Sequence, residues 1–168
     1  PASSPAPTLP TVPAPAGNLF ASVAPRETLE QIREDLGDCQ RCKLWKGRAN
    51  IVFGSGNPNA ELLFVGEGPG ADEDEQGLPF VGAAGKNLDK LLQKVGLTID
   101  DVYIANILKY RPPKNRNPLP EEIRAHAPWL IEQIKQMKPK VICSLGNYAT
   151  KFFFANGNVD DMEKMPGI

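Results

Sequence analysis

The segment from Gly66 to Gly85 constrains the fold more than any other part of the sequence. It follows the apolar run Leu62–Val65, which has the pattern of a buried strand, and it combines glycines, prolines and carboxylates before a helical pattern begins. A polar, glycine-rich loop at the carboxyl end of a strand is where an open α/β sheet binds its ligand. Glycine lets the backbone approach a ligand closely, and Phe80 offers a flat face to a planar one. The segment therefore predicts a ligand pocket, with a solvated acidic turn as the alternative.

A Walker phosphate loop is excluded at this segment. That motif needs an earlier glycine at a fixed distance from a Gly-Lys pair, and a Ser or Thr after the pair. Here Phe80 stands where the first glycine belongs, and Asn87 follows the pair Gly85-Lys86. The neighbouring carboxylates would also repel phosphate at short range. The ligand expected at this loop is therefore not a nucleotide triphosphate.

Apolar periodicity places the regular elements along the chain. We expect strands at 51–53, 61–66, 102–108 and 141–145, with the last of these buried. We expect helices at 27–36, 85–95, 121–137 and 147–154, and a loose end over 156–168. This alternation predicts a three-layer α/β/α fold around a short, mostly parallel sheet of four strands, from which a last strand is missing.

Composition indicates one globular domain with an N-terminal tail. The chain has 168 residues, of which 41% are hydrophobic and 23% charged, as in ordinary globular proteins. Residues 1–25 are rich in Pro, Ala, Ser and Thr and predict a disordered tether, which leaves 26–168 as the domain. No apolar run approaches the roughly 18 residues of a membrane span, so we expect no membrane association. The net charge of −1 means that any binding of a polyanion must use a local patch.

Asn106 lies near the carboxyl end of the expected strand 102–108. A buried asparagine must satisfy its amide, either by bonding to a neighbouring loop or by recognising a ligand. An amide offers both a donor and an acceptor, which suits the mixed edge of a pyrimidine. The proline-rich loop that follows is either solvated or suited to backbone phosphates, and its cations, with one from the next helix, are Lys109, Arg111, Lys114, Arg116 and Arg124.

Cys39 and Cys42 form a Cys-x-x-Cys pair. Zinc, iron–sulfur and redox roles are all open for such a pair, although it does not lie within the βαβ unit that a thioredoxin-like motif requires. A metal site needs about two further ligands, for which His126, Cys143 and Tyr110 are the candidates. A cysteine in a buried strand is more typical of the core, and a lone histidine is more typical of packing. The odd cysteine count and the lack of a signal peptide indicate a reducing compartment, the cytoplasm.

These motifs resemble the uracil-DNA glycosylase superfamily and are most similar to its iron–sulfur, type-4 group. The resemblance runs from about Leu29 to the end of the chain. It implies a DNA repair enzyme of bacterial or archaeal type, which flips uracil out of DNA and hydrolyses its N-glycosidic bond in base excision repair. The matching segments are Gly66–Gly70, Glu73-Asp74, Gly77–Gly85, Asn106, Lys109–Pro113 and Asn115–Pro118.

The resemblance also implies a role for each matching position. Phe80 stacks on the extruded uracil, and Asn106 binds its polar edge. The implied catalytic group consists of Glu67 and Gly68, which line the pocket, and of Glu73 or Asp74, which orient water or stabilise positive charge on the sugar. The implied contacts with DNA are Lys109, Arg111, Lys114, Asn115 and Arg116.

A [4Fe–4S] cluster bound by four cysteines is the cofactor that the resemblance implies. The first two cysteines match Cys39 and Cys42, but the third falls at Tyr110 and the fourth at His126. Histidine can ligate iron, whereas a tyrosine phenolate rarely does so in such clusters. We therefore expect an altered ligand set or no cluster. The family also continues to a further strand and a His-Pro-Ser loop, so we expect one open sheet edge and one open wall of the pocket.

Two other functions stay open at this point. One is a catalytically incomplete DNA-binding module of the same fold. The other is a metal-dependent regulator or partner-binding protein that uses Cys39, Cys42 and His126. The favoured partner is DNA that contains uracil, and the favoured oligomeric state is a monomer.

Overall fold

A computed structural model describes residues 28–166. The tail expected at 1–25 lies outside the described residues, so the boundary at residue 26 stays a prediction. The sheet has the strand order β1-β3-β2-β4. Strand β2 is parallel to both β3 and β4, and β1 is antiparallel to β3, which confirms the predicted, mostly parallel sheet. The strands are β1 (Ser55–Gly56), β2 (Leu62–Gly66), β3 (Tyr103–Asn106) and β4 (Val141–Ser144).

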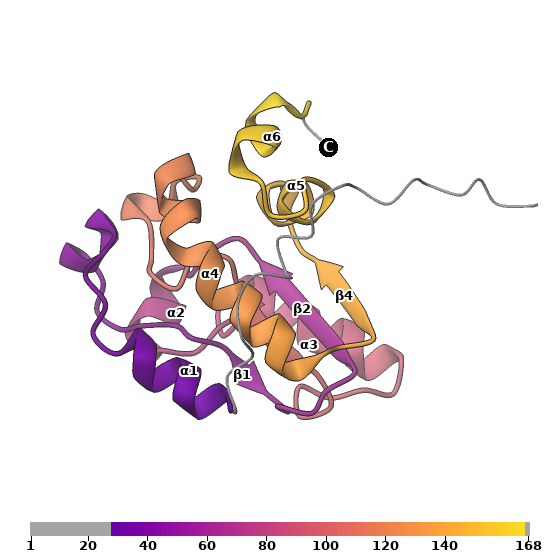
Figure 1. Cartoon of the computed structure of the whole chain (residues 1–168). Helices are drawn as coiled ribbons and strands as arrows, with labels where there is room; N and C mark the ends of the chain where they lie inside the picture. Colours follow the sequence, from indigo (N-terminus) through magenta and orange to yellow (C-terminus); the bar gives the residue numbers. More distant parts are fainter. Residues whose placement is uncertain (1–27, 167–168) are drawn as a thin grey trace, which may run out of the picture.

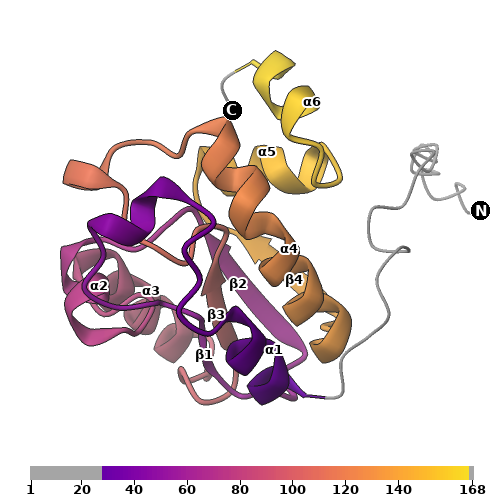
Figure 2. The same ribbon diagram turned by 60° about the vertical axis from the view of Figure 1, so that its left-hand side comes forward.

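Helices cover both faces of this sheet (Figures 1 and 2). One face carries α1 (Leu29–Leu36) and the long α4 (Pro120–Met137), and the other carries α2 (Ala71–Gln76) and α3 (Ala83–Lys94). Beyond β4, α5 (Asn147–Phe154) and α6 (Val159–Lys164) pack beside the start of α4. Two short 3-10 helices lie at Lys43–Lys46 and Pro113–Asn115. No helix within residues 28–166 is long and apolar enough to cross a membrane.

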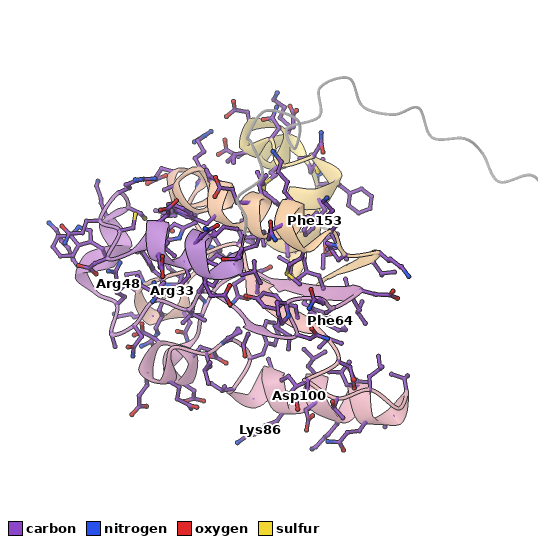
Figure 3. All side chains as sticks on the ribbon, turned by 60° about the horizontal axis from the view of Figure 1, so that its bottom comes forward. Arg33, Arg48, Phe64, Lys86, Asp100 and Phe153 are labelled. Atoms are coloured by element: carbon purple, nitrogen blue, oxygen red, sulfur yellow. The ribbon has the colours of Figure 1, made fainter. Side chains whose placement is uncertain are left out.

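Alternating side chains of the central strands divide the core between the two faces. Leu63 and Val65 join the larger apolar cluster beneath α1 and α4, whereas Phe64 packs with Leu88 and Leu92 of α3. Figure 3 labels Phe64 on this side of the sheet. Full burial of one such side chain contributes about 1.5–3 kcal/mol. This pattern fixes the register of β2 and therefore the level at which its glycine-rich continuation begins.

Three expected elements differ in the structure. Residues 51–53 form no strand, because their pairing is limited to a single bond from the Val52 N–H to the Lys109 carbonyl at 2.9 Å, and the strand begins later, at Ser55. The expected loose end contains α6, which Asn158 caps by accepting bonds from two N–H groups of the first turn. The acidic segment contains α2, whose carboxylates lie in the first turn, where the helix dipole favours them.

The prediction of a buried β4 is wrong. Val141 is 56% exposed and Ile142 is 37% exposed, because β4 pairs with β2 on one side and lies at the edge of the sheet. Cys143, expected in the core, is half-buried and packs against the cluster on the α3 side. The open sheet edge that the resemblance implies therefore corresponds to β4 within the described residues.

Candidate functional site

The site is built where β2 and β3 end side by side. Gly66, the last residue of β2, is the register partner of Asn106, the last residue of β3. The two chains stay paired for two more residues, because the N–H groups of Ile107 and Leu108 donate to the carbonyls of Gly66 and Glu67, each at 3.0 Å. Two motifs that lie far apart in the sequence therefore meet at one edge of the sheet. This arrangement follows from the parallel pairing that the sequence predicts.

Phe80 lies over this strand end in a strained conformation. Its φ of 54° is one that a bulky residue rarely adopts. A Cβ added to Gly66 would overlap both the Phe80 ring and the Asn106 amide oxygen, so all three groups share one small space. A Cβ at Gly85 would overlap the Phe80 carbonyl group. Glycine at these two positions is therefore what allows the ring to lie beside the amide.

A pocket of about 400 Å³ opens at this point. The Asn106 side chain is buried, and its Oδ1 atom has no hydrogen-bond partner among residues 28–166. A buried, unpaired acceptor is costly unless a ligand or water satisfies it. The pocket therefore holds an acceptor suited to a donor on a ligand. The predicted site residues that line it are Glu67, Gly68, Glu73, Phe80, Asn106, Asn115 and Arg116.

Glu73 holds the loop around Phe80 in place. Its Oε1 accepts the N–H groups of Val81 at 3.1 Å and Gly82 at 2.8 Å, and its Oε2 accepts the N–H of Gly70 at 3.1 Å. One carboxylate therefore ties the start of α2 to the segment that follows Phe80. Three charge-assisted bonds from backbone N–H groups hold the loop around Phe80 strongly to this carboxylate.

Asp74 does not belong to the pocket, which corrects its predicted catalytic role. Its side chain is buried and accepts bonds from the backbone N–H groups of Ala49 and Asn50. The helical turn of α2 directs it away from the pocket and toward this preceding segment. Asp72, which the sequence analysis did not single out, lines the pocket instead. The structure shows no hydrogen bond or ion pair from its carboxylate to another described residue.

Glu67 and Gly68 form the wall of the pocket next to β2. Glu67 accepts the Tyr148 N–H at 2.8 Å through Oε1, which links the motif to the first turn of α5. Gly68 lies against Leu108, at a distance where a Cβ would be tight, at 3.4 Å. No hydrogen bond to another described group engages the Gly68 N–H. Both residues line the pocket, and their roles in catalysis stay predictions.

Lys109 does not face DNA, which corrects its predicted role. Its side chain is fully buried. The Nζ atom donates to the carbonyls of Phe53 at 3.1 Å and Asn106 at 2.9 Å and to the Gln133 Oε1 at 2.6 Å. Burial lowers the pKa of Lys109 to about 7. The residue instead supports the strand end that carries Asn106, because it bonds to that residue's carbonyl.

The other predicted DNA contacts lie at the surface around the pocket. Arg111 donates through Nε to the Asn115 Oδ1 at 2.8 Å. Arg116 forms a two-bond ion pair with the buried carboxylate of Glu122. Lys114 is exposed and adopts a positive φ of 55°. These side chains are positioned by the turn at Pro113–Asn115, which the proline-rich sequence favours.

Tyr110 does not fit the third ligand position of a cluster. Its side chain is fully buried, and its hydroxyl donates to the backbone carbonyl of Cys39 at 2.7 Å. Arg48 donates to the same carbonyl at 2.8 Å, and its guanidinium lies 4.2 Å from the centre of the Tyr110 ring. Burial holds the pKa of Tyr110 above its ordinary value, which keeps the phenol protonated. Burial also raises the pKa of the Cys42 thiol.

His126 does not fit the fourth ligand position in this arrangement. Its Nδ1 accepts the Lys109 N–H at 3.0 Å, and burial lowers its pKa to about 3. In a neutral ring whose Nδ1 accepts, Nε2 carries the proton and has no lone pair for a metal. Within residues 28–166, no group of three or more His, Cys, Asp or Glu side chains could hold a metal ion. The donors present therefore do not fit a four-ligand cluster.

Comparison with known proteins agrees with this geometry. The model of the uracil DNA glycosylase superfamily matches residues 53–166. A "Type-4 uracil-DNA glycosylase" from Sulfurisphaera tokodaii is 48% identical over 130 residues, which cover 77% of this chain and 59% of that protein. A protein of the same name from Archaeoglobus fulgidus is 47% identical over 137 residues, or 82% of this chain and 67% of that one.

The site is thus a pocket at the strand ends of an α/β sheet that brings an aromatic ring next to an unpaired amide oxygen. The family match, which covers more than half of the chain, specifies the class of protein. This chain belongs to the uracil DNA glycosylase superfamily. It spans about three fifths to two thirds of the length of the relatives described above.

Proposed function

We propose that this chain supplies the base-binding site of a DNA repair glycosylase that hydrolyses the N-glycosidic bond of uracil. The observation that carries the proposal is the unpaired Oδ1 of Asn106, buried in one pocket with the ring of Phe80. The names of the relatives support the same substrate. We also propose that uracil-containing DNA is the partner and that the protein acts as a monomer.

Recognition of uracil depends on the Asn106 amide. Uracil presents an N–H donor beside a carbonyl acceptor, whereas cytosine presents the reverse pattern at the same edge. The unpaired Oδ1 accepts the uracil N–H. Cytosine would leave this buried acceptor unsatisfied, at a cost of about 1–3 kcal/mol. The carbonyl of Asn106 is bound by Lys109, which keeps the strand end in position for this contact.

The base reaches this amide only outside the DNA stack. An enzyme that acts on a base in a duplex extrudes the nucleotide and regains part of the lost stacking in its pocket. Phe80 supplies the flat surface for that contact, and Glu73 fixes the segment after it. Stacking on an aromatic side chain contributes about 1–3 kcal/mol per base. Phe80 and Asn106 therefore position the base from its face and from its edge.

Bond cleavage needs stabilisation of two charges. Uracil departs as an anion, and donors aimed at its oxygens stabilise the transition state; the Gly68 N–H is the donor we assign to this role. The sugar becomes positive, and the carboxylate of Asp72 at the pocket stabilises it and orients water. Glu73 acts on the same reaction by holding the loop. No step passes through an iron–sulfur cluster, because the donors do not fit one.

Uracil release from synthetic oligonucleotides tests the proposal. We expect this chain to release uracil from an oligonucleotide with one uracil and to leave a matched cytosine oligonucleotide intact. Asn106→Ala should abolish release, whereas Asn59→Ala, an exposed asparagine between β1 and β2, should not change it. Activity of Asn106→Ala close to that of the unaltered protein would show that the pocket is misassigned. DNA binding without release would favour the catalytically incomplete module.

A further inference from the structure

A second cleft, lined by positive charge, lies beside the base pocket. Its volume is about 610 Å³, and it lies between residues 41–47 and residues 111–122. The net charge of the whole chain is −1, so this is a local concentration of charge. The cations in its two walls are Arg41, Lys43 and Lys46 on one side and Arg111, Lys114 and Arg116 on the other. The first three were not among the predicted DNA contacts.

The wall that carries Lys43 and Lys46 is fixed to the core. The carbonyl of Cys39 accepts bonds from both Tyr110 and Arg48. Leu44, between the two lysines, is buried. Figure 3 labels Arg48, which anchors this segment at the side of the molecule. The short helix Lys43–Lys46 is therefore held in place while both lysine side chains remain exposed.

The charge of the cleft is not balanced within it. Its two carboxylates are Glu121 and Glu122. Glu122 is neutralised by its ion pair with Arg116. Glu121 is then the one carboxylate left in the cleft to balance the other five cations, which are Arg41, Lys43, Lys46, Arg111 and Lys114. The structure shows no ion pair from these five to a described carboxylate. Cations without a carboxylate partner attract an anion.

The cleft and the base pocket are adjacent and share part of a wall. Pro112 and Arg116 line both cavities. A nucleotide whose base enters the pocket remains attached to its strand, so the phosphates that flank it lie at the mouth of the pocket, which this shared wall adjoins. The cleft is therefore placed where the backbone of that strand emerges.

We infer that this cleft binds the backbone phosphates of the DNA strand whose base enters the pocket. The inference rests on the proposed function and adds to it a second segment, residues 41–47. Contacts between lysine or arginine and phosphate position a protein on DNA without reading sequence. They also release counterions, so that binding weakens as salt increases. The cleft thus supplies affinity, while Phe80 and Asn106 supply selection of the base.

The salt dependence of DNA binding tests this inference. The test variant is Lys43→Gln/Lys46→Gln, and the control is Lys90→Gln/Lys94→Gln, which removes two exposed lysines from α3 outside the cleft. The affinity of each for a uracil-free duplex is measured between about 50 and 200 mM salt. The slope of log K against log salt should shrink by about two for the test variant. The control should keep the slope of the unaltered protein.

A third variant gives a readout that misfolding cannot produce. Glu121→Gln removes the one unpaired carboxylate of the cleft and should increase affinity for the same duplex. An unchanged slope in the test variant, an equal loss in the control, or an unchanged affinity in Glu121→Gln would each overturn the inference. Uracil release is measured on the same preparations. A reduced slope in the test variant without uracil release would reject the proposed function alone, whereas release with an unchanged slope in the test variant would reject the cleft alone.

Discussion

Gly66 and Asn106 lie side by side at the ends of two parallel strands, and the missing side chain of the first makes room for the amide of the second. The Phe80 ring closes the same space from the loop that follows β2. Recognition of a base thus depends on one register pair. Any change that slips β2 against β3 by one residue would turn the Asn106 side chain to the opposite face of the sheet.

Gly66→Ala should reduce uracil release by about 100-fold or more, because the new methyl group displaces the ring or the amide from its position. Steady-state kinetics on a uracil oligonucleotide measure this effect. Asn59→Ala is the control, since it alters an exposed side chain that lines neither the pocket nor the cleft. Full activity of Gly66→Ala would show that the ring and amide do not act together.

Phe80→Ala should lower kcat/KM by about 10- to 100-fold, which corresponds to the loss of one stacking contact. The thermal midpoint should change little, because the ring is only half-buried and alanine keeps the Cβ that disfavours the positive φ of this position. Phe154→Ala serves as the control, since that side chain is 74% exposed on α5. A rate loss of the same size in both variants would argue against stacking at Phe80.

Asp72→Asn and Glu73→Gln should distinguish a carboxylate that acts in catalysis from one that holds the loop in place. We expect Asp72→Asn to lower the rate by about 100-fold or more and the free energy of unfolding by about 1 kcal/mol at most, since this carboxylate lines the pocket without other bonds and interacts only with the dipole of α2. Glu73→Gln replaces an acceptor that faces backbone N–H groups with a donor, and should lower the free energy of unfolding by about 1–3 kcal/mol as well as the rate. Kinetics and chemical denaturation on both variants measure the two effects. An equal loss of rate and of stability in the two variants would contradict these separate roles for Asp72 and Glu73.

The purified protein should contain no stoichiometric iron or acid-labile sulfide, because Tyr110 and His126 are engaged in bonds that a cluster would displace. A chelator should leave its thermal midpoint unchanged. Tyr110→Phe should cost about 1 kcal/mol through the lost bond to the Cys39 carbonyl. Metal analysis and thermal denaturation test both statements. A visible iron–sulfur absorption band would contradict them.

The free energy of unfolding should decrease as the pH falls from about 6.5 toward about 3. Burial lowers the pKa of His126 to about 3 in the folded protein, while the unfolded chain takes up the proton near the ordinary value of about 6.5. Between these values the unfolded state binds more protons, so acid favours it by up to about 1.4 kcal/mol per pH unit. Denaturation at several pH values, compared with His126→Gln, measures this contribution. An equal slope in the variant would assign the acid sensitivity to other groups.

The elements that carry the pocket could be predicted because each has a strong local pattern. Strands β2 and β3 and helices α3, α4 and α5 follow from apolar periodicity, and their alternation gives the parallel sheet. The two short helices α2 and α6 were missed, although each shows the acidic first turn of a helix start in its sequence. Their few apolar residues give no periodic signal, which is why they read as loops.

The orientation of single charged side chains could not be predicted. Four consecutive carboxylates occupy residues 72–75, and only formation of α2 decides that Asp72 lines the pocket while Asp74 is buried on another side. Lys109 begins a basic loop and was therefore assigned to DNA. Its burial depends on three oxygen atoms, and two of them, from Phe53 and Gln133, lie in distant parts of the chain, which no local pattern reveals.

The close approach of Gly85 to the Phe80 carbonyl also constrains which residues can occupy position 85 in related sequences. A lineage that acquires a side chain at residue 85 must rebuild the turn that presents the ring. The overlap is with the backbone of residue 80, so a change of side chain there does not relieve it. In a randomised library of this loop, surviving clones should retain glycine at 85 whatever residue occupies position 80.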